Sequence, residues 1–250
     1  VTLIARLVHL QVTDGGHGAV FLREQGALRT VRSAEIPVYR GLITDRNGTP
    51  LAVSSPVVSL WANPQQLKDS LRLGELAHIL GLDAHALRDK LAFYGDKQFM
   101  YLARHQSPDF AREVLRERFP GVRGEREYRR YYPAGEVTAQ VLGLTNVDGR
   151  GIAGVELAFE DWLQGVPGKK RFIKDLHGDA VRDFGVIEEP RPGKALALSI
   201  DLRLQYAHHR ELQRAMKETG AAAGSAVTID AWTGEVLAVS NYPVFNPNSR

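Results

Sequence analysis

Apolar and polar residues alternate over short distances in the first part of the chain, with frequent turn-forming breaks. The stretch RGLITDRNGTPLAV, residues 40–53, places two apolar runs on either side of the polar segment Asp45–Gly48. Asn and Gly both tolerate positive φ, so this segment predicts a hairpin turn. The run VVSLWA that follows is rich in β-branched residues and predicts a further strand, ended by Asn63 and Pro64.

Helix start signals come directly after this strand. Asn63 precedes Pro64, a good first helical residue, and Gln66 is placed to complete a capping box. Helical patterns continue over 75–80 and 83–93, and Ser107-Pro108 opens a further helix, which carries Phe110, Val114 and Leu115 on one face. This region is therefore predicted to consist of small helices packed on short strands.

The pattern changes in the second half. VELAFEDWL predicts one helix ended by Gly165, and KKRFIKD and AVRDFGVIEE predict two strands joined at 177–179. Residues 190–193 read as a linker. The strand KALALSI, a long helix from Asp201 to Lys217 and a hairpin of 226–230 with 235–240 then predict an incomplete second domain. The expected fold class is α+β.

The first twelve residues, VTLIARLVHLQV, are mostly apolar. Twelve residues are too few to cross a hydrocarbon core, which needs about 20. Three interpretations compete: a buried amphipathic helix, a trimmed signal peptide, and the outer end of a trimmed membrane anchor. Sequence chemistry alone favours the first.

Composition and charge narrow the functional classes. The 250 residues include 44% hydrophobic and 24% charged residues, as in ordinary globular proteins, and no cysteine, which excludes disulfides and a cysteine nucleophile. A net charge of +3 gives little reason to expect a polyanionic partner. The run Arg123–Tyr132 interleaves arginines with tyrosines, but its glutamates would oppose phosphate. It favours a solvated strand edge or an internal ion-pair layer over nucleic-acid binding.

Gly149, Gly151 and Gly154 match the G-x-G-x-x-G pattern before a helix, so a dinucleotide site has to be considered. Acidic residues crowd the start of that helix, and Lys169-Lys170 stand where a ribose-binding acid is expected. A tight structural loop is the better interpretation, and no cofactor is predicted. Glu156 and Glu160 have the spacing of paired carboxylates, but side chains with this pattern usually face solvent.

The sequence contains no visible catalytic centre. G-x-S-x-G, S-x-x-K and K-T-G are all absent from the 250 residues. The eight histidines are scattered, so no metal site is predicted.

Three longer segments resemble, in order, the N-terminal motifs of the class B penicillin-binding proteins. They are RGLITDRNGTPLA, RRYYPAGEVTAQVLG and GIAGVELAFEDWLQGVPGKK. KALALSIDLRLQ and GSAVTIDAWTGEVLAVSNYPVFNPN resemble the opening elements of the transpeptidase domain, most closely in the septal D,D-transpeptidases of the FtsI type. Gln140 and Trp232 depart slightly from the family pattern. The resemblance implies a structural role for these motif residues: Arg40, Gly41, Asp45, Arg46, Asn47, Gly48, Arg130, Tyr132, Pro133, Gly135, Gly151, Gly154 and Glu156.

The resemblance also implies the organisation of the chain. Residues 1–12 would end a trimmed anchor, 13–190 would form a non-catalytic pedestal (dimerisation) domain, and 191–250 would begin the transpeptidase domain. The full-length protein would span the bacterial inner membrane once, lie in the periplasm and contact an FtsW-type glycosyltransferase and other division proteins. It would act on peptidoglycan stem peptides and bind β-lactams, without nucleic acid. The alternative is a non-enzymatic envelope interaction module.

The charged residues of the three motifs predict one specific contact. Buried charge must be paired, and Gly41, Gly135 and Gly154 would allow backbones to pack closely. We therefore expect Glu156 to pair with Arg40, Arg46 or Arg130. The alternative is an exposed Glu156 that serves only the helix dipole.

Overall fold

The computed structural model describes residues 31–174 and 180–249, in which helices and strands mix as the predicted α+β class requires. The described residues form two compact units. One contains Val31–Ile36 and the described residues of Pro167–Arg191, and the other contains Pro37–Val166 and the described residues from Pro192 onward. Residues 1–12 lie outside the described part. No helix of the described residues is long and apolar enough to cross a membrane.

The smaller unit is a three-stranded antiparallel sheet in the order β1 (Val31–Ile36), β6 (Gly168–Lys174), β7 (Ala180–Glu188). The two strands predicted at 169–175 and 180–189 are confirmed, while their turn at 177–179 falls outside the described residues. Lys169 pairs with Glu35 on one side and Glu188 on the other, and its ammonium lies 2.9 Å from the Glu188 carboxylate.

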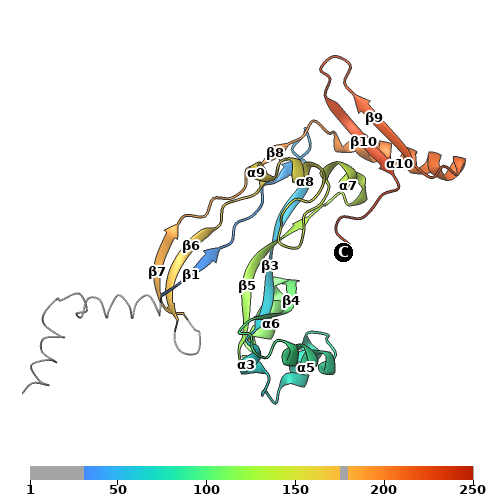
Figure 1. Ribbon diagram of the computed structural model, residues 1–250. Helices are drawn as coiled ribbons and strands as arrows, with labels where there is room; N and C mark the ends of the chain where they lie inside the picture. The colour runs from blue at the N-terminus through green and yellow to red at the C-terminus, as the bar shows by residue number, and fades with distance from the viewer. Residues whose placement is uncertain (1–30, 175–179, 250) are drawn as a thin grey trace, which may run out of the picture. The chain divides into compact units, whose positions relative to one another are not determined.

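The larger unit is organised around a long strand, β3 (Pro50–Ala62). Strand β5 (Val122–Tyr131) pairs antiparallel with β3 from Val53 to its end. Strand β2 (Ile43–Thr44) pairs with the first residues of β3. Strand β4 (Met100–Gln106) pairs with the last residues of β3, and Figure 1 shows β3, β4 and β5 side by side. The predicted hairpin turn is confirmed: it joins β2 to β3, and Gly48 adopts a φ of 83°.

Small helices surround the far end of β3. They are α3 (Pro64–Leu67), α4 (Leu73–Ile79), α5 (Ala84–Phe93) and α6 (Pro108–Arg116). The predicted caps are confirmed, because the side chains of Asn63 and Ser107 accept hydrogen bonds from the first turns of α3 and α6. Leu60 of β3 is fully buried among these helices, together with Leu76 and Val114.

The other end of β3 meets three further helices, α7 (Glu136–Leu142), α8 (Gly154–Ala158) and α9 (Glu160–Leu163). The prediction of one continuous helix over VELAFEDWL was wrong, because the chain leaves helical geometry at Phe159, where φ is −112° and ψ is 30°. Ile43, Tyr132, Leu142 and Leu163 form a second buried core here.

The last elements of the chain are β8 (Leu196–Ala197), α10 (Leu202–Thr219), β9 (Gly224–Ile229) and β10 (Val236–Tyr242). The predicted strand KALALSI is only two residues long and runs parallel to β2. Asp201 caps α10 as predicted, and β9 and β10 form the predicted hairpin. The buried side chain of Gln205 fastens α10 to β10, because it donates to the Val239 carbonyl and accepts from the Val239 amide.

Candidate functional site

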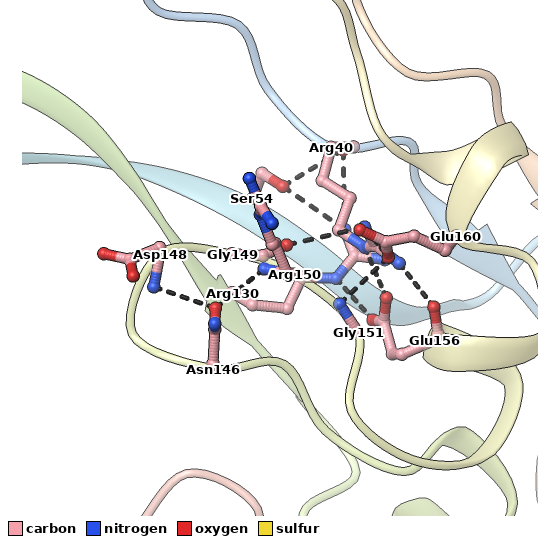
Figure 2. A network of polar contacts seen from close by, with 10 residues as sticks. All are labelled: Arg40, Ser54, Arg130, Asn146, Asp148, Gly149, Arg150, Gly151, Glu156 and Glu160. Atoms are coloured by element: carbon pink, nitrogen blue, oxygen red, sulfur yellow. Dashed lines mark hydrogen bonds and ion pairs between the residues drawn. The ribbon is translucent and has the colours of Figure 1, made fainter.

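The three motifs meet at a buried ionic centre in the larger unit, which we call the Arg–Glu centre (Arg40, Arg130, Glu156). Arg40 precedes β2, Arg130 lies near the end of β5 and Glu156 lies in the first turn of α8. The Glu156 carboxylate accepts from Arg40 Nε at 2.5 Å and from Arg130 Nε at 2.7 Å, one guanidinium on each oxygen (Figure 2). The predicted pairing of Glu156 is therefore confirmed, with two arginines instead of one.

Further contacts of Arg40 extend the centre. Its Nη1 lies 2.7 Å from a carboxylate oxygen of Glu160, and its Nη2 donates to the Glu156 carbonyl at 2.6 Å. Two guanidinium and two carboxylate groups thus balance in charge. Sequence reasoning expected Glu160 to face solvent, and this was wrong: the two carboxylates of α8 and α9 converge on Arg40 from either side of the break at Phe159 (Figure 2).

Arg130 is held from the opposite strand. Its Nη1 donates to Ser54 Oγ of β3 at 3.2 Å, and Ser54 donates in turn to the Arg40 carbonyl at 3.0 Å. Arg130 Nη2 is buried without a hydrogen-bond partner among the described residues. The side chain of Glu156 is 0% exposed and that of Arg130 is 2% exposed, so water does not screen this pair.

Tyr132, a buried neighbour of the Arg–Glu centre, has an altered acidity. The Tyr132 ring belongs to the second core, and burial, together with the negative charge of Glu156, raises the pKa of its hydroxyl to about 12. Tyr132 therefore stays neutral over the physiological pH range. Pro133 follows it on the surface, and Gly135 begins α7 with a φ of 52°.

Glycines bring the backbones of the motifs into contact. A Cβ on Gly41 would overlap the Lys194 carbonyl, one on Gly151 would overlap the Glu156 carbonyl, and one on Gly154 would press on the Gly143 amide and the end of α7. Close approach at Gly41 and Gly154 is therefore confirmed. Gly135 was predicted wrongly in this respect: no atom lies within 4 Å of its Cβ direction, and its requirement is the positive φ.

The glycine pattern at 149–154 forms the tight loop that the sequence favoured. Thr145 and Gly151 form a β-bridge, and Asn146 Oδ1 accepts from the amides of Asp148 and Arg150. The Gly151 amide donates to Glu160 at 2.9 Å. These amides, which a phosphate would need, are thus bonded within the chain (Figure 2).

The hairpin turn of the first motif forms a second junction. The buried Asp45 carboxylate accepts from the amides of Asn47 at 2.9 Å, Thr49 at 2.7 Å and Leu202 at 3.2 Å. Burial alone would raise the pKa of Asp45, but these three hydrogen bonds hold it below its ordinary value of 3.8. The turn is therefore tied directly to the start of α10.

Arg46 and Asn47 add two contacts across this junction. Arg46 pairs with Glu235 at 3.2 Å, so its candidacy as the partner of Glu156 was wrong. It projects from the exposed tip of the hairpin, where a long charged side chain stays hydrated. Asn47 donates to Asp201, the cap of α10, at 3.4 Å.

Sequence reasoning did not find the part played by Asn248. Its side-chain amide donates to the Tyr132 carbonyl at 2.9 Å, and its side-chain oxygen accepts from the Tyr132 amide at 3.0 Å. Gln140 Nε2 also donates to the Pro243 carbonyl at 3.0 Å. The segment after β10 is thereby fixed to the second motif.

A second polar cluster lies between β3, β4 and β5 around Glu127, within the run 123–132. Of the two interpretations that the sequence left open for this run, the internal ion-pair layer holds at Glu127. Its carboxylate accepts from Ser59, from the Tyr101 hydroxyl at 3.3 Å and from Arg104 at 3.1 Å. Arg104 also pairs with Asp148 at 3.2 Å, in the loop that carries the glycine pattern. The glutamates among the arginines of this run, and a serine within an apolar strand, are the sequence signals for this cluster.

The described residues contain no group of three metal-ligating side chains. The arrangement instead consists of ion pairs and hydrogen bonds between side chains of distant segments. Such an arrangement holds segments of the chain together, because its charged groups contact each other and do not line a cavity.

Comparisons with known proteins identify a matching family and similar proteins. Residues 35–198 match the family model of the penicillin-binding protein dimerisation domain. The chain is 45% identical to the probable peptidoglycan D,D-transpeptidase PbpC of Pseudomonas aeruginosa, over 98% of the chain and 43% of that protein. It is 41% identical to the peptidoglycan D,D-transpeptidase FtsI of Escherichia coli K12, over 99% of the chain and 42% of that protein. The chain thus spans less than half the length of these relatives.

Solved structures agree on the fold. The chain resembles penicillin-binding protein 2 in its complex with MreC from Helicobacter pylori, with a TM-score of 0.65 and 21% identity, over 87% of the chain and 44% of that protein. It also resembles penicillin-binding protein 2X of Streptococcus thermophilus, with a TM-score of 0.62 and 21% identity, over 87% of the chain and 36% of that protein.

Proposed function

Because the chain belongs to the penicillin-binding protein family, we propose that it is the pedestal, with the first transpeptidase elements, of a septal peptidoglycan D,D-transpeptidase. The pedestal performs no chemistry and positions the catalytic domain. The relatives named D,D-transpeptidases at 41% and 45% identity support this assignment.

One observation carries the proposal: the motif segments bond directly to residues 191–250. The Leu196 amide donates to the Leu42 carbonyl at 2.8 Å, and the Leu198 amide donates to the Thr44 carbonyl at 2.9 Å. The Asp45, Asn47 and Asn248 contacts add side-chain bonds over the same junction. A joint made by both backbone and buried side chains suits an element that must hold a catalytic domain in one orientation.

The proposed reaction belongs to the full-length protein. A serine in S-x-x-K attacks the D-Ala-D-Ala bond of a stem peptide, the last D-Ala leaves, and an amine of a neighbouring strand takes the acyl group from the serine. A nearby lysine and an oxyanion hole would assist, as in other covalent acyl transfers. β-Lactams would acylate the same serine. The 250 residues contain no S-x-x-K, so the pedestal itself is proposed to be inactive.

The setting of this activity is also part of the proposal. We place the protein at the division septum, anchored once in the inner membrane, with the pedestal in the periplasm. Similarity to FtsI supports the septal role. We further propose that the pedestal docks an FtsW-type glycosyltransferase and other division proteins. The Helicobacter pylori complex, in which a penicillin-binding protein of the same fold is bound to MreC, supports a protein partner.

Two measurements on the full-length protein test the proposal. Fluorescent penicillin should label it, and its expression in Escherichia coli depleted of FtsI should restore septation. The variant Glu156→Gln should lose rescue, whereas Glu136→Gln, an exposed first-turn residue of α7, should keep it. Labelling without any rescue by the unmodified protein would contradict the septal role. Absence of labelling would contradict the enzyme and favour the envelope interaction module.

A further inference from the structure

A cleft of about 480 Å³ opens beside the end of α5, at the helical end of β3. Its walls come from α5, the turn after it and the start of β4, and they include Lys90, Tyr94, Lys97, Phe99, Met100 and Tyr101. The volume lies in the range of sites that hold a small ligand or a few side chains. None of these residues takes part in the Arg–Glu centre or in the junction with α10.

The cleft has a rigid apolar wall. The ring of Phe99 is held between Trp61, at a centroid distance of 5.0 Å, and Tyr101, at 4.8 Å. Phe99 is nevertheless 41% exposed, whereas Met100 beside it is buried. A fixed and exposed aromatic ring presents apolar surface without a loss of side-chain freedom on binding, as at protein interfaces.

Two ammonium groups border this apolar wall. Lys90 Nζ donates to the Tyr101 carbonyl at 2.7 Å, and Lys97 Nζ lies 5.0 Å from the centre of the Tyr94 ring. Within the part of the chain that the structure describes, neither lysine forms an ion pair with a carboxylate. No direct ion pair therefore neutralises these two lysines within the described residues, in contrast to the arginines of the Arg–Glu centre.

We propose that this cleft docks a short acidic segment of a partner protein. An aliphatic or aromatic side chain of that segment packs on Phe99, next to the buried Met100, and flanking carboxylates pair with Lys90 and Lys97. A segment with one apolar residue and an acidic residue within one or two positions on each side of it would make all of these contacts. The inference rests on the proposed role of the pedestal in docking partners and names the chemistry of one docking segment.

Methionine NMR provides a direct test on the 250-residue chain, because it has only two methionines. Met100 lines the cleft, and Met216 lies near the end of α10. With ¹³C-methyl methionine, titration of the acetylated tetrapeptide amide Glu-Leu-Phe-Glu should shift the Met100 signal in a saturable way and leave Met216 unchanged. The uncharged peptide Gln-Leu-Phe-Gln should bind at least about fivefold more weakly, and salt at about 0.5 M should reduce the difference.

Single substitutions locate the charges. Lys90→Gln and Lys97→Gln should each weaken binding of the acidic peptide about two- to fivefold, the range for partly exposed ion pairs. Lys68→Gln, an equal charge change at an exposed position after α3, should have no effect. Phe99→Ala should abolish the Met100 shift.

Several outcomes would overturn the proposal: no shift, equal shifts at both methionines, equal affinity of the two peptides, or an equal Met100 shift on addition of N-acetylmuramic acid. The last would assign the cleft to an anionic sugar. These results concern only the cleft, whereas penicillin labelling and rescue of septation test the pedestal role, so failure of one proposal is distinguishable from failure of the other.

Discussion

At the scale of single residues, the shared carboxylate of Glu156 determines how the Arg–Glu centre responds to change. Arg40 also contacts Glu160, and Arg130 also contacts Ser54. Among the described residues, Glu156 is the side chain that bonds to both guanidinium groups. Its loss would leave two buried cations close together, with Glu160 as their remaining carboxylate among the described residues, on Arg40.

Substitution of Glu156 should therefore be costly. Glu156→Gln should lower the free energy of unfolding by about 3 to 5 kcal/mol, because it leaves buried positive charge uncompensated. Glu136→Gln, also in a first helical turn but exposed, should cost only about 0.3 to 1 kcal/mol. Urea unfolding of both variants measures the difference. Equal costs would contradict the role of Glu156 as the electrostatic centre.

Asp45 should give the protein a characteristic acid dependence. Its folded pKa lies below 3.8, so its carboxylate stabilises the fold at neutral pH, and this contribution is lost as pH falls below 3.8 towards the folded pKa. Asp45→Asn should cost about 1 to 3 kcal/mol at pH 7, since hydrogen bonds to a charged group are replaced by weaker ones.

Denaturant unfolding at pH 7, 5 and 3 tests this expectation. The difference between the unmodified protein and Asp45→Asn should be constant from pH 7 to 5 and smaller at pH 3. Asp109→Asn, which changes an exposed acid in α6, serves as the control. A difference that does not change with pH would show that the charge of Asp45 contributes nothing.

The ion pairing of Glu156 could be predicted only in part from the sequence. A glutamate among glycines and apolar residues had to be paired or exposed, and the motifs offered three arginines, so pairing of Glu156 could be predicted. That Arg40 and Arg130 both bind it depends on the register of β3 with β5, in which Ser54 faces Arg130. No local pattern encodes that register. Arg46 could not be excluded beforehand, because its exposure follows from the position of the turn.

At the scale of elements, close backbone contact at Gly154 joins the third motif to α7. Gly154 and Gly149 both have positive φ, 61° and 79°. They differ in their surroundings: a Cβ on Gly154 would meet the Gly143 amide at 2.5 Å and the Leu142 carbonyl carbon at 2.7 Å, whereas one on Gly149 would have no neighbour within 4 Å. Comparing substitutions at these two glycines therefore distinguishes the cost of backbone strain from the cost of a steric clash.

Alanine substitutions should reveal this difference. Gly149→Ala should cost about 1 to 2 kcal/mol, the strain of a left-handed alanine. Gly154→Ala should cost clearly more, because α7 or α8 must also move. Thermal unfolding measures both. Equal destabilisation would mean that backbone conformation, and not contact with α7, explains the glycine at position 154.

Local chemistry explains which elements could be predicted. Asn63-Pro64, Ser107-Pro108 and Asp201 mark helix starts through short-range hydrogen bonds, so sequence alone located them. Strand β4 has no such signal: MYLARHQ lacks regular alternation, and pairing with β3 defines it. Its residue His105 even adopts a φ of 55°, which only the surrounding contacts can enforce.

At the scale of the whole molecule, stability should be uneven. Strand β3 pairs with β5 and β4, and several of its side chains are buried against the helices. Strands β9 and β10 instead form a two-stranded sheet with exposed residues such as Val227 and Ile229. Isolated two-stranded elements are marginally stable in water.

Hydrogen exchange should therefore be faster in β9, β10 and α10 than in β3 and β5. The same measurement on the full-length protein should show stronger protection after Gly193, if the rest of the transpeptidase domain packs on this region as we propose. Equal protection of all these elements in the 250-residue chain would contradict the expectation.

The lack of S-x-x-K leads to a simple whole-molecule prediction. The 250-residue chain should form no covalent adduct with a fluorescent penicillin, because no serine has a lysine three positions later. Denaturing gel electrophoresis would reveal an adduct as a labelled band at 27.7 kDa. Such a band would mean that another nucleophile in the chain reacts. The full-length protein, labelled in parallel, provides the positive control.

The double hydrogen bond between Asn248 and the Tyr132 backbone has a consequence for protein engineering. The side-chain amide here bonds to Tyr132 as the backbone of an adjacent strand would, so the contact fixes how many residues can lie between the end of β10 and Asn248. Insertion or deletion of one residue between Tyr242 and Asn248 would present the wrong group to Tyr132. Chimaeras that combine these residues with the C-terminal part of a relative should therefore be joined after Asn248, so that the number of residues between β10 and Asn248 is kept.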